Sequence, residues 1–271
     1  MKQPQHMMAK IVSELAMTHA LLNCLIKEFS LPEKKLHYRW PDELEGLQPE
    51  SCLNGIHRQA LPILIELSPK RELFVLVDRY SSIGSQRYLS DVYARHKDAP
   101  WSIFEFESLA KFILEGCAAL TGVFNRELFE QVLSSQQLVS DILSYQDGEL
   151  KHTAFSSYIA SEQNLWFGHP NHPAPKARMW PADWPQQEVT PEFQASAYLH
   201  CFEVPINGLQ TQSNGMTQAE VLSAIAPQRS LHTSALNDNH QSDPDHKHEQ
   251  EHALISMHPV QAQLFMQDDR V

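Results

Sequence analysis

One stretch of the chain, residues 168–178, reads Gly-His-Pro-Asn-His-Pro-Ala-Pro-Lys-Ala-Arg and carries more information about structure and function than any other. Alternating prolines hold a segment near polyproline geometry, in which three residues make one turn, so we expect His169 and His172 to project from the same side. Lys176 and Arg178 lie two residues apart, and in an extended stretch they would share a face. Gly168 permits a tight turn before them. The sequence therefore predicts a stiff loop that presents two imidazoles and two cations.

Such a loop suits the binding of a polyphosphate, because its donors hold their places while negative charge develops on a ligand. A second interpretation is a proline-stiffened surface loop whose histidines cap backbone carbonyl groups. The residue types alone leave both interpretations open.

The first part of the chain shows alternating helical and strand periodicity. Helical spacing over 8–29 predicts a helix that ends at the Leu31-Pro32 step, because proline restricts the residue before it and lacks the N–H that a helix needs. Apolar residues alternate over 61–67 and 73–77 around the polar break Ser68-Pro69-Lys70-Arg71, which indicates a β-hairpin or two sheet-forming strands. Helical periodicity returns over 107–120, over 126–143 with Asn125 as N-cap, and over a short stretch at 153–162. Residues 1–150 are therefore predicted to form a mixed helix and strand domain.

The second part, residues 151–271, has a different texture. Prolines crowd in after Glu162 and exclude a long helix there. Further on, the pattern predicts a strand over 198–205 and a short helix over 217–226. Residues 231–251 are polar and rich in His, Asp, Asn and Gln, so we expect a solvated insertion. The fold class predicted for the whole chain is α+β.

Composition restricts the kinds of partner and the compartment. The chain of 271 residues has 21 Lys and Arg against 33 Asp and Glu, and this acidic balance disfavours nucleic acid as a partner. Four cysteines lie far apart without a C-x-x-C pair, which favours reduced thiols in a cytoplasmic protein. The first residues lack a signal-peptide pattern and no later segment approaches about 20 apolar residues, so neither export nor a membrane location is expected.

Three motifs, in this order, carry a resemblance to a known family. The first is the 168–178 stretch, preceded by Glu162-Gln163. The second is Thr190-Pro191-Glu192-Phe193 with the apolar run that follows it. The third is Ile255-Ser256-Met257-His258-Pro259-Val260-Gln261, in which Val260 stands where the family has a tryptophan. Together they resemble the NRPS-independent siderophore synthetases of the aerobactin-synthetase (IucA/IucC) family.

The resemblance implies a fold and an activity. The implied fold has an N-terminal helix and strand unit, a central nucleotide-binding sheet domain and a larger helical C-terminal domain around a deep cleft. Residues 151–271 would form part of the nucleotide-binding domain, and the C-terminal helical domain would be absent from this chain. The implied activity is adenylation of a carboxylate, usually citrate, by MgATP, followed by attack of an amine, hydroxyl or hydroxamate substrate. His169, Lys176 and Arg178 would face the nucleotide with His172 beside them, and Glu162 could orient His169 or Arg178. Catalytic residues are not assigned.

The chain also departs from the family pattern. Met179-Trp180 follows the motif where the family usually has glycine. The family's serine and arginine-threonine phosphate loop and its C-terminal domain would come after Val271, so we expect an incomplete synthetase that is inactive as an isolated chain. A homodimer or a complementing C-terminal polypeptide could complete it. Alternatively, the chain is a non-catalytic fragment or partner subunit of a full-length synthetase.

A different alternative is a His-rich metal-binding protein. It is motivated by four histidines in and beside the polar insertion, of which His248 and His252 are four apart and could share a helical face. The insertion lacks the buried groups that orient metal ligands, so we expect adventitious binding there rather than a dedicated site. The four are His240, His246, His248 and His252.

Overall fold

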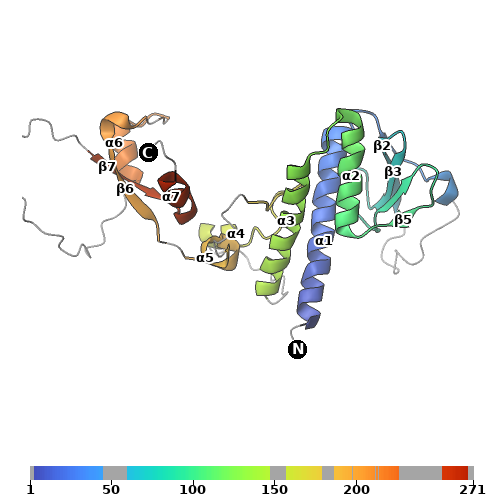
Figure 1. Cartoon of the computed structure of the whole chain (residues 1–271), viewed down its shortest axis with the longest axis horizontal. Helices are drawn as coiled ribbons and strands as arrows, with labels where there is room; N and C mark the ends of the chain where they lie inside the picture. The colour runs from blue at the N-terminus through green and yellow to red at the C-terminus, as the bar shows by residue number, and fades with distance from the viewer. Residues whose placement is uncertain are drawn as a thin grey trace, which may run out of the picture. The chain divides into compact units, whose positions relative to one another are not determined.

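The computed structural model of the protein describes residues 3–44, 60–146, 157–178, 186–196, 198–210, 212, 214–225 and 252–267. The chain forms two compact units, Met1–Pro181 and Ala182–Val271. The predicted boundary between residues 150 and 151 marks the start of a nucleotide-binding domain. A division into compact units does not test where nucleotide binding begins, so this boundary stays a prediction. The α+β class agrees with the mixture of helices and strands (Figure 1).

The first unit contains a five-stranded sheet and a layer of three long helices (Figure 1). The sheet is antiparallel throughout, in the order β1-β2-β3-β4-β5. In chain order, the described elements of the first unit are α1 (Gln3–Leu25), a π-helical turn η1 (Ile26–Ser30), β1 (Leu36–His37), η2 (Asp42–Leu44), β2 (Leu61–Ser68), β3 (Arg71–Val77), β4 (Tyr93–His96), β5 (Ser102–Ile103), α2 (Phe106–Thr121), α3 (Arg126–Tyr145) and α4 (Tyr158–Gln163).

Helix α1 is the core helix of the first unit. It lies against α3 and α2, and the Leu31-Pro32 step ends it as predicted, after a last turn that is π-helical. The segment His6–Ser30 is long and apolar enough to span a membrane by length and composition, so the prediction that no segment approaches that length is wrong. Half of its most apolar window is buried inside the unit, which accounts for its composition. The buried residues include Met17, Ala20, Leu21, Leu22, Leu25 and Ile26.

The predicted hairpin is confirmed as β2 and β3, which pair with Ile63 opposite Val75 and Ile65 opposite Leu73. These four side chains are fully buried, because α2 covers their face of the sheet. A Cβ on Gly116 of α2 would lie only 2.9 Å from Leu67 Cβ, so glycine is what allows the helix to lie this close to β2.

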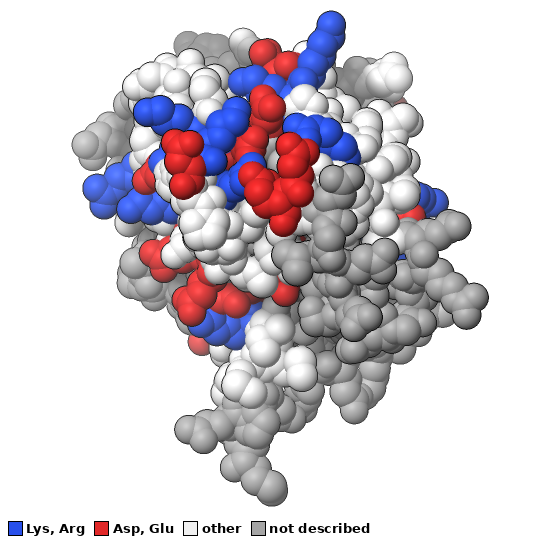
Figure 2. All heavy atoms as spheres, turned by 90° about the vertical axis from the view of Figure 1, so that its right-hand side faces the viewer, with Lys and Arg blue, Asp and Glu red and all other residues white. Residues whose placement is uncertain are grey.

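The other face of the sheet is closed by aromatic rings around Phe74. Trp40 lies 5.2 Å from the Phe74 ring, and Tyr93 and Trp101 each lie 6.2 Å from it, between centroids. The Arg95 guanidinium stacks 4.4 Å above Trp101 and donates to the Glu72 carboxylate at 2.8 Å. The space-filling view of this side of the molecule shows positive and negative side chains interspersed (Figure 2).

The second unit is built around a two-stranded antiparallel sheet in which Phe202 pairs with Ile255. The predicted strand and short helix are confirmed as β6 and α6, and Phe202 also contacts Phe265 of α7 at 5.2 Å between ring centroids. The elements are α5 (Gln186–Val189), η3 (Pro191–Phe193), β6 (His200–Pro205), η4 (Ile206–Gly208), α6 (Gln218–Ile225), β7 (His252–Met257) and α7 (Pro259–Met266).

Several remaining predictions meet the structure only in part. The helices predicted over 107–120 and 126–143 are confirmed as α2 and α3, whereas the one predicted over 153–162 is described only as α4. The insertion 231–251 lies outside the described residues. His252 begins strand β7, so the idea that it shares a helical face with His248 is wrong. Cys24, Cys117 and Cys201 are free thiols, as expected, and Cys52 lies outside the described residues.

Candidate functional site

The motif loop, residues 168–178, follows α4 and folds into two tight turns. His172 N donates to His169 O at 3.2 Å, and Ala177 N donates to Ala174 O at 3.2 Å. The polyproline geometry predicted for this stretch is therefore wrong, and so is the extended geometry predicted for Lys176. The physical reason is that Pro170 and Pro175 each occupy the second position of a turn, where the fixed φ of proline favours a turn as readily as an extended chain.

The two histidines of the motif loop bond backbone amides. Asn171 N donates to His169 Nδ1 at 3.2 Å, and Ala174 N donates to His172 Nδ1 at 3.1 Å. Both imidazoles are exposed. The alternative interpretation, in which they cap carbonyl groups, named the wrong backbone partner: in these two bonds the rings accept from N–H groups.

Gly168 and Lys176, at opposite ends of the loop, come together. Gly168 has a φ of +69°, and a Cβ built on it would lie 2.8 Å from Pro175 Cβ and 3.3 Å from Lys176 Cε. The Lys176 side chain thus runs back along the loop toward Gly168. The residue is only 6% exposed, a degree of burial that lysine rarely reaches. The loop closes on itself, and glycine is the residue that permits this closure.

One buried side chain of α1, Asn23, ties the start of the loop to the rest of the unit. Its Nδ2 donates to Pro170 O at 3.3 Å, and its Oδ1 accepts from Gln86 N at 2.9 Å and from the Tyr88 hydroxyl at 2.8 Å. Beside it, Ser85 Oγ donates to the Asn171 side chain at 2.8 Å. Helix α1, the segment after β3 and the motif loop therefore meet around Asn23.

A second anchor holds the end of the loop against α3. Lys176 N donates to Ser135 Oγ at 2.9 Å, and this hydroxyl in turn donates to Met17 Sδ of α1 at 3.3 Å. Ser135 is completely buried. Because both ends of the loop bond to the helical layer, the loop is held by the same core that supports the sheet.

Burial changes the pKa values of two groups near Asn23, namely Tyr88, which bonds to it, and His19, which lies beside Tyr88. It raises the pKa of the Tyr88 phenol far above its ordinary value, so the hydroxyl stays a hydrogen-bond donor. It lowers the pKa of His19, whose ring lies 4.9 Å from that of Tyr88 between centroids, from 6.5 to about 4. Both groups are therefore uncharged at neutral pH.

The structure brings some predicted site residues together and not others. His169, His172 and Lys176 all belong to the anchored loop, whereas Glu162 lies on α4 and is half-buried, as is Arg178 at the end of the loop. The roles predicted for these five residues stay predictions.

The sequence interpretation missed the anchoring residues Asn23, Ser85 and Ser135. A signal for two of them was present. Asn23 and Ser135 are polar positions within the apolar faces of their helices, and a buried polar side chain needs a partner.

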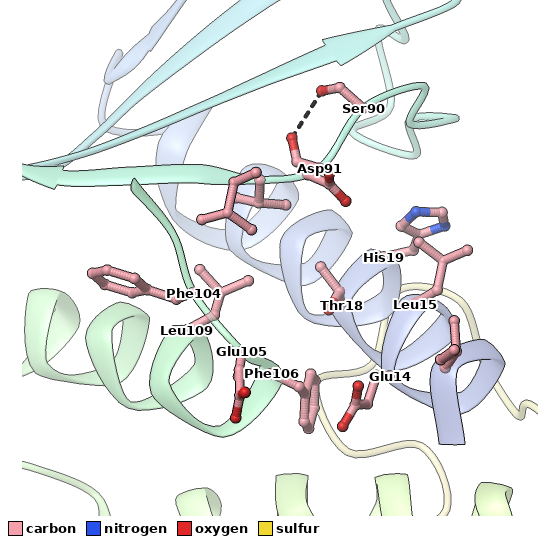
Figure 3. A pocket seen from close by; sticks show the side chains of 13 residues that line it. Glu14, Leu15, Thr18, His19, Ser90, Asp91, Phe104, Glu105, Phe106 and Leu109 are labelled. Atoms are coloured by element: carbon pink, nitrogen blue, oxygen red, sulfur yellow. Dashed lines mark hydrogen bonds between the residues drawn. The ribbon is translucent and has the colours of Figure 1, made fainter. Parts of the chain in front are cut away.

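The first unit also contains a cavity of about 340 Å³ between α1, the segment before β4 and the start of α2 (Figure 3). Glu14, Glu105 and Phe106 lie on one side of it, and Ser90, Asp91 and His19 on the other (Figure 3). Among the described residues that line it there is no Lys or Arg, and its three carboxylates would repel phosphate groups. The motif loop, with two cations, is therefore the better candidate for a nucleotide.

The second and third motifs lie in the second unit. Thr190, Glu192 and Phe193 around η3 are buried. His258 is the N-cap of α7 and accepts from Val260 N through Nδ1 at 3.3 Å. Val260 is itself buried, so this position of the third motif packs in a core. Nowhere in the described ranges do three His, Cys, Asp or Glu side chains gather as a metal site.

Comparisons with known proteins agree with the resemblance. The model of the IucA / IucC family matches residues 157–271. A spermidine-citrate ligase from Bacillus anthracis is 26% identical over 145 residues, which cover 52% of this chain and 23% of the ligase. The ATP-bound structure of the aerobactin synthetase IucA from Klebsiella pneumoniae aligns with a TM-score of 0.62 at 18% identity. A second structure of that synthetase aligns with a TM-score of 0.58, also at 18% identity.

These alignments also give the extent of the likeness. The two synthetase structures match 94% of this chain, which in turn covers 40% and 41% of theirs. At 18% identity they show a shared fold. The chain thus spans well under half the length of the proteins it resembles.

Proposed function

We propose, since residues 157–271 belong to the IucA/IucC family, that this chain supplies part of the ATP-binding region of a siderophore synthetase. The observation that carries the proposal is the motif loop, residues 168–178, held in place by Asn23 and Ser135. Its loop geometry keeps two imidazoles, one lysine and one arginine on a short, doubly anchored segment. Such fixed donors stabilise the charge of phosphate groups without moving when the reaction occurs.

The reaction proposed is adenylation of a carboxylate, citrate or a related acid, followed by condensation with an amine, hydroxyl or hydroxamate. Three facts support it: the family match, the name of the Bacillus anthracis relative, and the ATP in the solved synthetase. In this reaction His169, His172, Lys176 and Arg178 would bind the phosphates as pyrophosphate leaves, and Glu162 would orient His169 or Arg178. The site would lie in a cytoplasmic protein.

Magnesium would enter together with the nucleotide. Mg²⁺ is usually bound by one or two carboxylates and the phosphates of the substrate, and a dedicated cage of protein ligands is uncommon. The residues of the motif loop supply nitrogen donors and cations, which suit the phosphates and not the metal. We therefore assign no metal ligand in this chain.

The experiment is a titration of the purified chain with MgATP by calorimetry. Two charge-assisted contacts of about 1.5–3 kcal/mol each, set against the unfavourable free energy of association, predict a Kd around 1 mM or weaker. Lys176→Met keeps the buried stem and removes the charge, so binding should weaken roughly tenfold or more. Lys97→Met, at an exposed position of the first unit outside the motif loop, is the matched control and should bind as the wild type does.

Two results would count against the proposal in different ways. Equal affinities of Lys176→Met and wild type would exclude the loop as the phosphate site. Micromolar affinity would show that the site needs no further polypeptide.

The alternative proposal is a non-catalytic fragment or partner subunit of a full-length synthetase. Exchange of pyrophosphate into ATP in the presence of citrate distinguishes the two. Exchange by the chain alone indicates an enzyme, whereas exchange only after a second polypeptide or a synthetase partner is added indicates a subunit.

A further inference from the structure

Three His-Pro steps in this chain share one local hydrogen bond. In each, the backbone N–H two residues after the histidine donates to the imidazole Nδ1. The bonds are Asn171 to His169 at 3.2 Å, Ala174 to His172 at 3.1 Å and Val260 to His258 at 3.3 Å. The first two lie in the motif loop and the third starts a helix in the other compact unit. The shared geometry therefore follows from the His-Pro-Xaa sequence and not from one particular environment.

The proline explains the recurrence. The proline ring fixes φ near −65° and has no N–H, so the first backbone amide after the histidine that can donate belongs to the residue after the proline. That amide turns back toward the histidine side chain, as an amide does toward Asp, Asn, Ser or Thr at a helix start. At His258 this bond is an N-cap, with a backbone φ of −59° and ψ of 143°.

The bond determines which ring nitrogen carries the proton. A neutral imidazole has one N–H and one acceptor nitrogen, and a nitrogen that accepts from a backbone amide is the unprotonated one. We propose that His169 and His172 are held as neutral Nε2–H tautomers and act as directional hydrogen-bond donors to an anionic group of the ligand. That the ligand is a nucleotide phosphate rests on the proposed function, whereas the tautomer does not.

This assignment excludes one chemical role for both residues. A general base needs a free lone pair on nitrogen. In His169 and His172 the Nδ1 lone pair is engaged by the backbone, and Nε2 already carries its hydrogen. The two imidazoles therefore complement the fixed charges of Lys176 and Arg178 with oriented dipoles, and a proton that must be removed from an acyl acceptor has to go to another group.

The tautomer is tested by long-range nitrogen–proton NMR of the imidazole rings in the full chain at neutral pH. Peaks are assigned by their loss in His169→Gln and His172→Gln. Both rings should show an unprotonated Nδ1 and a protonated Nε2. His200, which is exposed on β6 and is followed by cysteine, is the control and should show averaging between the two tautomers. A protonated Nδ1, or averaging like that of His200 in both rings, would overturn the inference.

The donor role is tested separately by MgATP titration of substituted chains. A glutamine side chain still offers an N–H, so His169→Gln and His172→Gln should bind within about threefold of wild type. His169→Ala and His172→Ala should each weaken binding about tenfold, the loss of one hydrogen bond to a charged group. If the alanine and glutamine variants lose affinity equally, the donor role is refuted even where NMR confirms the tautomer. If Lys176→Met binds MgATP as the wild type does, the proposed function fails and the NMR result still stands by itself.

Discussion

Replacing Asn23 by alanine removes the side chain around which α1, the segment after β3 and the motif loop meet. Asn23 is 5% exposed, so water does not take over its bonds. The substitution leaves the Gln86 amide and the Tyr88 hydroxyl, now bonded at 2.9 and 2.8 Å, without their acceptor. Each buried group left unpaired costs about 1–3 kcal/mol. The bond to Pro170 O, at 3.3 Å, is longer and contributes less.

We therefore expect Asn23→Ala to lower the free energy of unfolding of the first unit by about 2–5 kcal/mol. The measurement is urea denaturation of the full chain, followed by the fluorescence of the tryptophans in that unit and by circular dichroism. For a unit of this size, a loss of 1 kcal/mol corresponds to a decrease of about 2–4 °C in Tm, so thermal unfolding provides a second reading.

A double-mutant cycle with Tyr88→Phe tests the hydrogen bond itself. Tyr88→Phe alone should cost about 1 kcal/mol, because the Asn23 side chain still accepts the hydrogen bond from the backbone N–H of Gln86. The double variant no longer contains an unpaired phenol, so its loss should be smaller than the two single losses together by about 0.5–2 kcal/mol. Additive losses, or a loss below 1 kcal/mol for Asn23→Ala, would refute the argument that this side chain anchors the loop.

Three further predictions follow from single positions. Gly168→Ala should cost about 2–3 kcal/mol and weaken MgATP binding, because alanine at φ +69° is strained and its Cβ would meet the rigid ring of Pro175; unchanged urea unfolding would contradict it. Burial lowers the pKa of His19 in the folded protein, so the stability that its neutral ring contributes is fully present above pH 6.5. The free energy of unfolding should decrease by roughly 3 kcal/mol as pH falls toward about 4. Urea unfolding of His19→Gln should lack this acid dependence. Asn125→Ala should cost only about 1 kcal/mol by urea denaturation, since Asn125 caps the exposed start of α3 through Leu128 N; a loss as large as that of Asn23→Ala would contradict this reasoning.

Local patterns in the sequence predicted much of the secondary structure because they depend on near neighbours in the chain. Helical spacing identified α2 and α3, and alternation identified the hairpin of β2 and β3. Asn125 was recognised as an N-cap because an asparagine before a helical run satisfies the first free amides. Motif order indicated the family, which the family model supports over residues 157–271.

The same local rules failed where a competing local structure was equally favourable. Prolines at 170, 173 and 175 suit both a polyproline segment and a series of turns, and composition does not choose between them. The turns are favoured because they allow the loop to form its own backbone hydrogen bonds and those to Asn23 and Ser135 at the same time. Burial of Lys176 could not be predicted either, because it depends on helices that lie far away in the sequence.

By itself the sequence determined the three long helices and the β2–β3 hairpin of the first unit, the free thiols among the described cysteines, and the resemblance to the IucA/IucC family. The tertiary structure alone decided which residues hold that loop. The contact of Asn23 with Pro170 joins positions 147 residues apart, and that of Ser135 with Lys176 joins α3 to the loop. Such pairs arise from the packing of whole elements, in which a buried polar group must find whatever partner the fold places beside it. Periodicity along the chain contains no record of that partner, because it reports only which face of an element is apolar.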